Sequence, residues 1–412
     1  MFRIKQVIAF SFMFIVGVAQ ALLVEEAPSK IPYNRCLEYC LATTEDGLGQ
    51  VTLSRNNGLY FLTGANLGAH THWINDFVII PQTFQAGCFE EMSLADLRFV
   101  THSDALVASG EKKSQGSFSV LEGPANADIR KLQADRRFNG ATFQVASNYN
   151  ALETVDPEQD ILTQSLSSYV FDNTQGPAAV LGAPAGLLFR RYALCNTLKH
   201  GQQARMDSSW GQLPCQQYGF DQRQVNFLQC ICNQDTGIQM SPAGYVKLNN
   251  AVRDPLSHEC ELIDIGCQRA TQVVFGAIDG HPSSLKTMVE IVPHKQIINQ
   301  VFVAAPDFGQ GTNKRSSRAD AWAKTILRAS YEGTLRMAHL YGSKDVVLTW
   351  VGGGAFNNDP AWVVEILEDL EPLIKELGLN VTLAAYGFTS GQEAFRGRLE
   401  GLVARTCGTW VK

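Results

Sequence analysis

The sequence has no excess of basic residues, and this excludes one class of partner. Its 412 residues include 34 Lys and Arg against 40 Asp and Glu, so the formal net charge is −6. Surfaces that bind nucleic acid carry a positive charge or a basic patch. We therefore expect no nucleic acid partner. With 45% hydrophobic and 18% charged residues, the chain predicts a sizeable core rather than a disordered segment.

Long hydrophobic runs are absent beyond the first 21 residues. Arg3 and Lys5 precede an apolar run that ends in Ala19-Gln20-Ala21, where small residues flank a signal-peptidase site. This run is shorter than the roughly 20 apolar residues of a membrane anchor. We predict that residues 1–21 are a cleaved signal peptide. The mature chain is then expected to lie outside the membrane and to be secreted, or to reside in a secretory or periplasmic compartment.

Paired Cys-x-x-Cys motifs, which zinc ribbons use, are also missing. The cysteines number ten, an even number, and five of them lie between Cys215 and Cys267. In an oxidising compartment such cysteines form disulfides. We expect a disulfide-rich insertion at about 196–267, with a connectivity that the sequence leaves open, and we expect neither a metal nor a cofactor.

The chain divides into two regions by its pattern of apolar residues. Short apolar runs separated by Gly, Asn and Pro predict a β-rich N-terminal region at 22–135. From residue 136 strands alternate with helices, which predicts an α/β domain at 136–412 with helices on the faces of a sheet. The main elements expected there are strands at 143–146, 272–276, 300–304, 345–351 and 381–385, a helix at 317–341, and a helix from 360 to 377 kinked at Pro372.

A glycine-rich turn follows the strand at 345–351. It reads Gly352-Gly353-Gly354-Ala355-Phe356-Asn357-Asn358, and Asp359 and Pro360 then begin a helix as N-cap and first residue. Glycines let a ligand approach the backbone, and helix N-termini present unpaired N–H groups. The turn therefore predicts an anion site suited to a diphosphate. A flexible connection between strand and helix is the alternative. The Lys-Ser/Thr pair of a P-loop is missing.

A second stretch of small residues runs from Gln175 to Gly186. Gly, Ala and Pro dominate it, so little side-chain bulk covers its backbone. Such a stretch can lie against a ligand or against another backbone. We expect a second ligand-binding loop here, and tight packing of a helix on the sheet is the alternative.

These segments, in this order, resemble macrodomains. The strand that leads into Asn148, the small-residue stretch, the strand at 301–304 and the glycine-rich turn follow one another as in that superfamily. The segment Gly-Ala-Phe-x-x-Asp-Pro is most similar to the corresponding loop of poly(ADP-ribose) glycohydrolases. The resemblance covers about 138–195 and 268–390. It implies a three-layer α/β/α fold around a mixed sheet, with the N-terminal region and the cysteine-rich insertion added.

The resemblance also implies a ligand and its contacts. The chain would bind ADP-ribose or a related nucleotide diphosphate, with Asn148 at the ribose and Tyr386 at the adenine. Phe356 would lie against a sugar or the base; filling space beneath its loop is the alternative, as capping a turn is for Asn148. The two phosphate-binding loops would contribute the remaining contacts, which come from Gln175, Gly176, Gly352, Gly353, Gly354, Ala355 and Asn357.

One departure from the family leaves catalysis open. The glycohydrolases carry two adjacent glutamates after the first loop, and this chain has Leu187-Leu188-Phe189-Arg190-Arg191 there instead. Glu153 is the nearest carboxylate in sequence to Asn148 and is the predicted substitute for the missing general acid, with Asp156 or Glu158 as stand-ins. Hydrolysis of ADP-ribosyl linkages rests on this residue. The alternative function is an exported interaction or effector protein that keeps the scaffold without ligand or catalysis. A serine hydrolase is disfavoured because no Gly-x-Ser-x-Gly motif is present.

Overall fold

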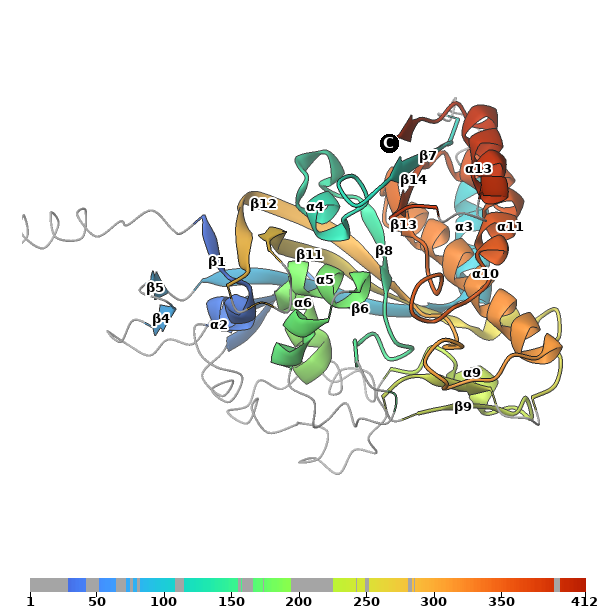
Figure 1. The fold of residues 1–412 in the computed structure, drawn as a ribbon, viewed down its shortest axis with the longest axis horizontal. Helices are drawn as coiled ribbons and strands as arrows, with labels where there is room; N and C mark the ends of the chain where they lie inside the picture. Colours follow the sequence, from blue (N-terminus) through green and yellow to red (C-terminus); the bar gives the residue numbers. More distant parts are fainter. Residues whose placement is uncertain are drawn as a thin grey trace, which may run out of the picture.

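A computed structural model gives the fold of the chain (Figure 1). It describes residues 29–41, 52–63, 72–74, 77–79, 82–107, 115–154, 157, 166–172, 174–193, 225–241, 243–248, 252–280, 284, 286–388 and 393–412. The predicted signal peptide lies outside these residues. Within them, no helix combines the length and the apolar character that crossing a membrane requires.

Helices and short helical turns connect the strands. The helices are α2 (Cys36–Leu41), α3 (Leu94–Val107), α4 (Ile129–Ala134), α5 (Gln175–Gly182), α6 (Pro184–Leu188), α9 (Gln229–Cys232), α10 (Ser317–Leu340), α11 (Pro360–Asp369), α12 (Glu371–Leu377) and α13 (Glu393–Arg405). The short turns are η1 (Tyr33–Arg35), η3 (Arg136–Phe138), η4 (Leu166–Phe171), η5 (Phe189–Ala193) and η6 (Glu259–Leu262).

The strands form one large mixed sheet and two small hairpins. They are β1 (Lys30–Pro32), β2 (Thr52–Asn56), β3 (Leu59–Thr63), β4 (His72–Ile74), β5 (Phe77–Ile79), β6 (Thr83–Ser93), β7 (Ser117–Glu122), β8 (Thr142–Ala146), β9 (Ile238–Met240), β10 (Val246–Leu248), β11 (Asp264–Asp279), β12 (Met288–Val303), β13 (Asp345–Thr349), β14 (Asn380–Ala385) and β15 (Trp410–Val411). The hairpins pair β4 with β5 and β9 with β10.

The large sheet changes character along its width. Its order is β15-β7-β14-β13-β8-β12-β11-β6-β3-β2, and β1 also pairs with β12. Neighbouring strands from β15 to β12 are parallel, whereas those from β12 to β2 are antiparallel. The parallel half gathers several strand ends at one edge, which is where α/β proteins place their ligands.

Helices cover both faces of the parallel half, in line with the expected α/β architecture. Strand β12 shows why, because Val301 and Val303 belong to one core while Phe302 and Ala304 belong to the other. A strand that is buried on both faces reads as a continuous apolar run. The first core includes α10, α11 and α13, which Figure 1 shows grouped together, and the second includes α4, α5 and α6.

The local signals read from the sequence between 345 and 385 are confirmed. The strand is β13, the Asp359 side chain accepts from the backbone N–H of Ala361, and Pro360 begins α11. The expected kink is a break at Leu370 between α11 and α12, and Gly378 ends α12 at φ +64°.

The N-terminal region is not a separate sheet. Its strands β1, β2, β3, β6 and β7 all belong to the large sheet, and β7 lies between β14 and β15. Gly123 and Asp128, near the expected boundary at 135, lie in the loop that connects β7 to α4. The turn-rich composition there marks a loop, and composition alone does not distinguish a loop from a linker.

The predicted disulfides are not found among the described residues. All eight cysteines that the structure describes have free thiols, and Cys195 and Cys215 lie outside the described ranges. The described part of the insertion is held by apolar packing instead, since Phe227, Leu228 and Ile231 are buried in the core. Hydrophobic burial stabilises this segment without cross-links.

Candidate functional site

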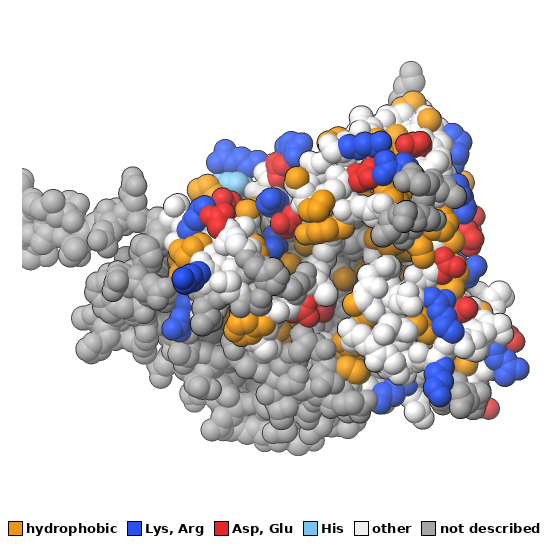
Figure 2. Space-filling model, viewed as in Figure 1, with side chains coloured by type: hydrophobic (Ala, Val, Ile, Leu, Met, Phe, Trp, Pro, Cys, Tyr) orange, Lys and Arg blue, Asp and Glu red, His pale blue; other side chains and the backbone are white. Residues whose placement is uncertain are grey.

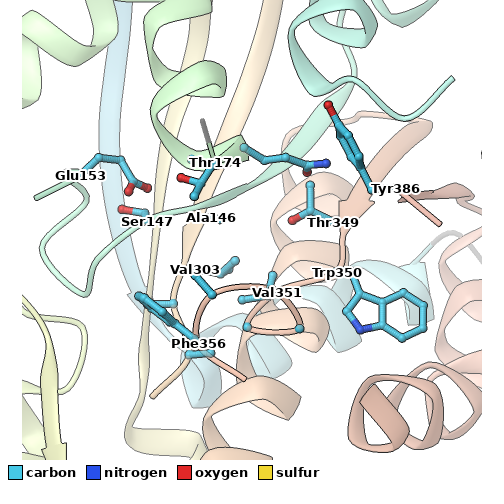
Figure 3. Close-up of a pocket in the computed structure, with 18 of the residues that line it drawn as sticks. Ala146, Ser147, Glu153, Thr174, Val303, Thr349, Trp350, Val351, Phe356 and Tyr386 are labelled. Atoms are coloured by element: carbon cyan, nitrogen blue, oxygen red, sulfur yellow. The ribbon is translucent and has the colours of Figure 1, made fainter. Parts of the chain in front are cut away.

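A cavity of about 440 Å³ opens at the carboxyl ends of four neighbouring parallel strands (Figure 3). The last residue of each strand lines it: Ala146 of β8, Val303 of β12, Thr349 of β13 and Ala385 of β14. The loops that follow these strands and the start of α5 complete the wall. The volume lies in the range of small-molecule sites, about 300–1,000 Å³.

The glycine-rich turn forms the side of the cavity beyond β13. Gly352 has φ +73°, a left-handed conformation that glycine adopts without strain. A Cβ there would lie 2.6 Å from the Ala305 Cβ, so a side chain does not fit. At Gly354 a Cβ would meet nothing within 4 Å. The turn is therefore closed on its inner side and open to solvent at its tip.

The turn presents backbone donors. Within the described residues, the N–H groups of Gly352, Gly354, Ala355 and Phe356 donate to no protein acceptor, and all four residues line the cavity. Successive free N–H groups in a tight turn make an anion-binding concavity. This turn can therefore hold a phosphate without a basic side chain.

Two side chains fix the shape of the turn from behind. Buried Asn358 donates from Nδ2 to the Pro306 carbonyl oxygen at 2.8 Å. Arg315 donates from Nη2 to the Asn357 carbonyl oxygen at 2.5 Å, and its guanidinium lies 4.7 Å from the Phe308 ring centroid. These contacts hold the turn in one shape before any ligand arrives.

The second small-residue stretch is helical, so the expected second loop is wrong. Its residues form α5 and α6, and only Thr174, Gln175 and Gly176 at the start of α5 line the cavity. A Cβ at Gly182 would lie 3.0 Å from Gln133 Oε1. The small residues allow the helices to pack closely on the sheet, which is the alternative that the sequence left open.

Glu153 lies at the acidic end of the cavity, against the start of α5. A Cβ at Gly176 would lie 2.4 Å from its Oε1, which is buried and has no hydrogen-bond partner within the described residues. Its backbone N–H donates to Tyr169 Oη at 2.9 Å. Burial, and then the nearby Asp172 carboxylate, raise the pKa of Glu153 well above its usual value, while Arg190 lowers it by less. Such surroundings favour the protonated form of the carboxyl group, which is the form that can donate a proton.

Arg190 lies behind Glu153 and is buried. Its Nε donates to the Ala151 carbonyl oxygen at 3.0 Å, and its guanidinium lies 4.0 Å from the Phe302 ring centroid. Burial lowers the pKa of Arg190 to about 9, so the side chain remains a cation at neutral pH. Arg190 does not line the cavity.

Asn148 has its amide hydrogens engaged. It is buried, and Nδ2 lies 2.5 Å from Thr154 Oγ1 and 3.2 Å from the Ala243 carbonyl oxygen. The residue thus fixes the loop after β8, the role left open as an alternative to ribose binding. Its Oδ1 accepts no hydrogen bond from the described residues and belongs to a residue that lines the cavity.

Aromatic side chains form the opposite end of the cavity. Tyr386, just after β14, is 53% exposed, and the Trp350 ring lies 5.5 Å from that of Phe388 in an edge-on arrangement. Figure 3 shows Tyr386 and Trp350 on the side away from Glu153. Strand order explains the separation, because β13 lies between β14 and β8.

One buried hydroxyl between the two ends lacks a partner. Thr349 is only 3% exposed, lines the cavity, and has no hydrogen-bond partner for Oγ1 within the described residues. Buried polar groups normally have partners, and an orphan in a cavity wall is suited to a ligand.

The cavity brings together almost every residue predicted from the sequence. Asn148, Glu153 and Tyr386 line it. So do Gln175 and Gly176 of α5 and the turn from Gly352 to Phe356. Asn357 does not. The sequence missed Asp172, Thr174, Tyr245, Thr349 and Trp350. The Thr174 N–H donates to Asp172 Oδ1 at 2.7 Å, so an Asp two residues before a helix N-cap signals only a turn. Asp156 and Glu158, the stand-ins for Glu153, lie outside the described residues.

The structure is similar to solved poly(ADP-ribose) glycohydrolases. The protein from Deinococcus radiodurans in complex with ADP-ribose is 14% identical, with a TM-score of 0.41, and the match covers 76% of this chain and 95% of that one. The protein from Thermomonospora curvata is 13% identical, with a TM-score of 0.33, covering 77% and 85%. No protein-family model and no curated protein matches the chain. The likeness is remote.

Proposed function

We propose that the cavity binds ADP-ribose or a related nucleotide diphosphate. The observation that carries this proposal is the glycine-rich turn at the end of β13. Four of its residues line the cavity and have backbone N–H groups that donate to no acceptor within the described residues. No Lys, Arg or His lines the described cavity wall, so the backbone is its source of donors for an anion. Backbone donors of this kind bind phosphate in many folds.

The two ends of the cavity set the direction of the ligand. The aromatic end, with exposed Tyr386, suits a nucleobase, because rings stack on bases. The polar end, with Asn148 and Glu153, suits the distal ribose. The diphosphate then lies between them at the turn, where the orphan Thr349 hydroxyl offers one further hydrogen bond.

We further propose that Glu153 makes the site hydrolytic. In its neutral form it donates a proton to the atom that leaves the anomeric carbon of the distal ribose, as that bond breaks. Water then bonds to the anomeric carbon and returns a proton to the Glu153 carboxylate. The buried, unpaired Oε1 and the raised pKa of Glu153 support this role. With the signal peptide expected from the sequence, such an activity would act on extracellular substrates, inside a host cell, or within an organelle reached through the secretory route.

Calorimetric titration with ADP-ribose tests the binding proposal. The matched variants are Gly354→Ala and Gly354→Glu, because a Cβ at this position meets no atom within 4 Å. We expect saturable binding by the unmodified protein and by Gly354→Ala. Gly354→Glu places a carboxylate beside the diphosphate and should weaken binding at least hundredfold, about 2.7 kcal/mol. Absence of binding by the unmodified protein would instead support the ligand-free interaction protein.

A release assay tests the catalytic part separately. Incubation with ADP-ribosylated protein should liberate ADP-ribose, and Glu153→Gln should lower that rate by about 10²–10⁴ with little change in affinity. Binding without release in the unmodified protein would leave a module that recognises ADP-ribose and does not cleave it.

A further inference from the structure

The end of the cavity that holds Glu153 has a second carboxylate, that of Asp172. Asp172 lines the cavity beside Glu153 and is partly exposed. The Thr174 N–H occupies its Oδ1, and no ion pair within the described residues neutralises it. A carboxylate held in this way presents a negative charge to whatever is attached beyond the distal ribose.

The basic residues nearby do not cancel this charge at the cavity wall. Arg190 is 2% exposed and does not line the cavity. Its Nε and Nη1 donate to the Ala151 carbonyl oxygen and to Gln268 Oε1, while its buried Nη2 has no hydrogen-bond partner within the described residues. Asp172 acts on the Glu153 carboxyl more strongly than Arg190 does. Arg191 is also buried and does not line the cavity.

The cavity wall next to the distal ribose therefore carries a negative charge, that of Asp172. A polymer of ADP-ribose would bring a further diphosphate to this end, against Asp172, and like charges at short range repel. A polyanion also needs a basic surface, whereas Figure 2 shows Lys and Arg interspersed with Asp and Glu on the described part of the face it draws.

We propose that the leaving-group end of the cavity selects a positively charged side chain, so that the substrate class is a single ADP-ribose attached to an arginine guanidinium. This inference rests on the proposed binding of ADP-ribose. A planar guanidinium matches a carboxylate in charge and in hydrogen-bond geometry. In the reaction, the bond from the anomeric carbon to the guanidinium nitrogen breaks and a bond to water oxygen forms. Glu153 gives its proton to the departing nitrogen and recovers one from the water, so charge is conserved.

Binding to matched peptides tests the selection. One peptide carries ADP-ribose on arginine, and a second, otherwise identical, carries it on serine. Glu153→Gln is used to prevent turnover, alone and together with Asp172→Asn or Asp172→Glu. Asparagine keeps the Oδ1 acceptor for the Thr174 N–H and removes only the charge.

We expect the arginine-linked peptide to bind at least tenfold more tightly than the serine-linked peptide. Asp172→Asn should reduce this ratio below about threefold, and Asp172→Glu should restore most of it. The preference should also weaken as salt rises, because the pair is partly exposed. Equal affinities for the two peptides, an unchanged ratio in Asp172→Asn, or tighter binding of an ADP-ribose oligomer would overturn the inference. Free ADP-ribose is titrated in parallel, and its failure to bind would overturn the proposed function instead.

Discussion

Two stretches rich in small residues, 352–358 and 175–186, invite the same interpretation, yet they fold differently. The first is a turn with Gly352 and Asn357 in left-handed conformations at φ +73° and +51°. The second is the pair of helices α5 and α6, buried along most of their length. Both reach the cavity, but the turn contributes five residues in a row and the helices contribute only their first turn.

The arrangement of the small residues explains this difference. In the turn, three consecutive glycines follow a buried strand and precede Asp359, which caps α11. In the helical stretch, single glycines are separated by residues that include Ala and Leu, which favour helix. Pro177 and Pro184 lie in first turns, where their missing N–H costs nothing. Consecutive glycines expose the backbone of the turn to a ligand. Glycines spaced along a helix instead allow the helix to pack closely against a neighbouring strand.

The largest effect on ADP-ribose affinity is expected at Gly352, where the turn has no room for a side chain. Gly352→Ala introduces a Cβ 2.6 Å from that of Ala305, at a φ that alanine rarely adopts. The turn must then change shape, and we expect ADP-ribose affinity measured by calorimetry to fall at least hundredfold, about 2.7 kcal/mol. Gly354→Ala is the control, with a change of less than about threefold. Similar losses in both variants would mean that the shape of the turn is not what binds the ligand.

Next in size is a change at the start of α5. Gly176→Ala places a Cβ 2.4 Å from Glu153 Oε1 and 2.8 Å from the Ala146 carbonyl oxygen. We expect a loss of about 1–3 kcal/mol in the free energy of unfolding, together with a lower rate of ADP-ribose release because the carboxyl group is displaced. Gly182→Ala, in the same helix and away from the cavity, should leave the release rate unchanged. An unchanged rate of ADP-ribose release in Gly176→Ala would mean that Glu153 does not take part in catalysis.

The raised pKa of Glu153 predicts a dependence of stability on pH. The stability that its protonated form contributes is fully present below the ordinary value of 4.5 and is lost as pH rises through its pKa in the folded protein. Relative to Glu153→Gln, the unmodified protein should therefore lose stability as pH rises above about 4.5. Urea unfolding at several pH values measures this difference.

A second carboxyl group, which is partly buried, provides the control for that experiment. Burial and Asp264 raise the pKa of Glu91, in β6, to about 7. Glu91→Gln should alter the same stability profile and leave ADP-ribose release untouched, because Glu91 does not line the cavity. A difference between unmodified protein and Glu153→Gln that stays constant with pH would show that folding does not raise the pKa of Glu153.

The smallest effect is expected at the aromatic end. Tyr386→Ala removes one exposed ring, and we expect ADP-ribose affinity to fall about five- to tenfold, in line with about 1–1.4 kcal/mol for stacking. Leu256→Ala, another exposed apolar residue outside the cavity, should change nothing. A loss at Tyr386 larger than that at Gly352 would make the ring, rather than the turn, the main source of affinity.

Much of the fold could be predicted from the sequence because its signals are local. The strand, cap, proline and glycine around 345–385 each act within a few residues, and the structure has them in those roles. The pairing of β7 with β14 and β15 could not be predicted in this way, because these strands are far apart in the chain. The free cysteines were missed for a related reason, since pairing depends on distance in space.

The site could be predicted where backbone chemistry defines it. The glycine-rich turn is visible in the sequence, and so is the Asn that follows β8. Thr349 and Trp350 could not be singled out, because their position at a strand end becomes meaningful only when neighbouring strands are known. Asp172 was missed because its hydrogen bond to the Thr174 N–H is an ordinary feature before a helix.

A crystal structure of the chain with ADP-ribose tests the central claim most directly. We predict that oxygens of the diphosphate lie about 2.7–3.2 Å from backbone nitrogens among Gly352, Gly354, Ala355 and Phe356, with the distal ribose toward Glu153. A diphosphate bound away from this turn, or a ligand turned so that adenine lies at Glu153, would contradict it.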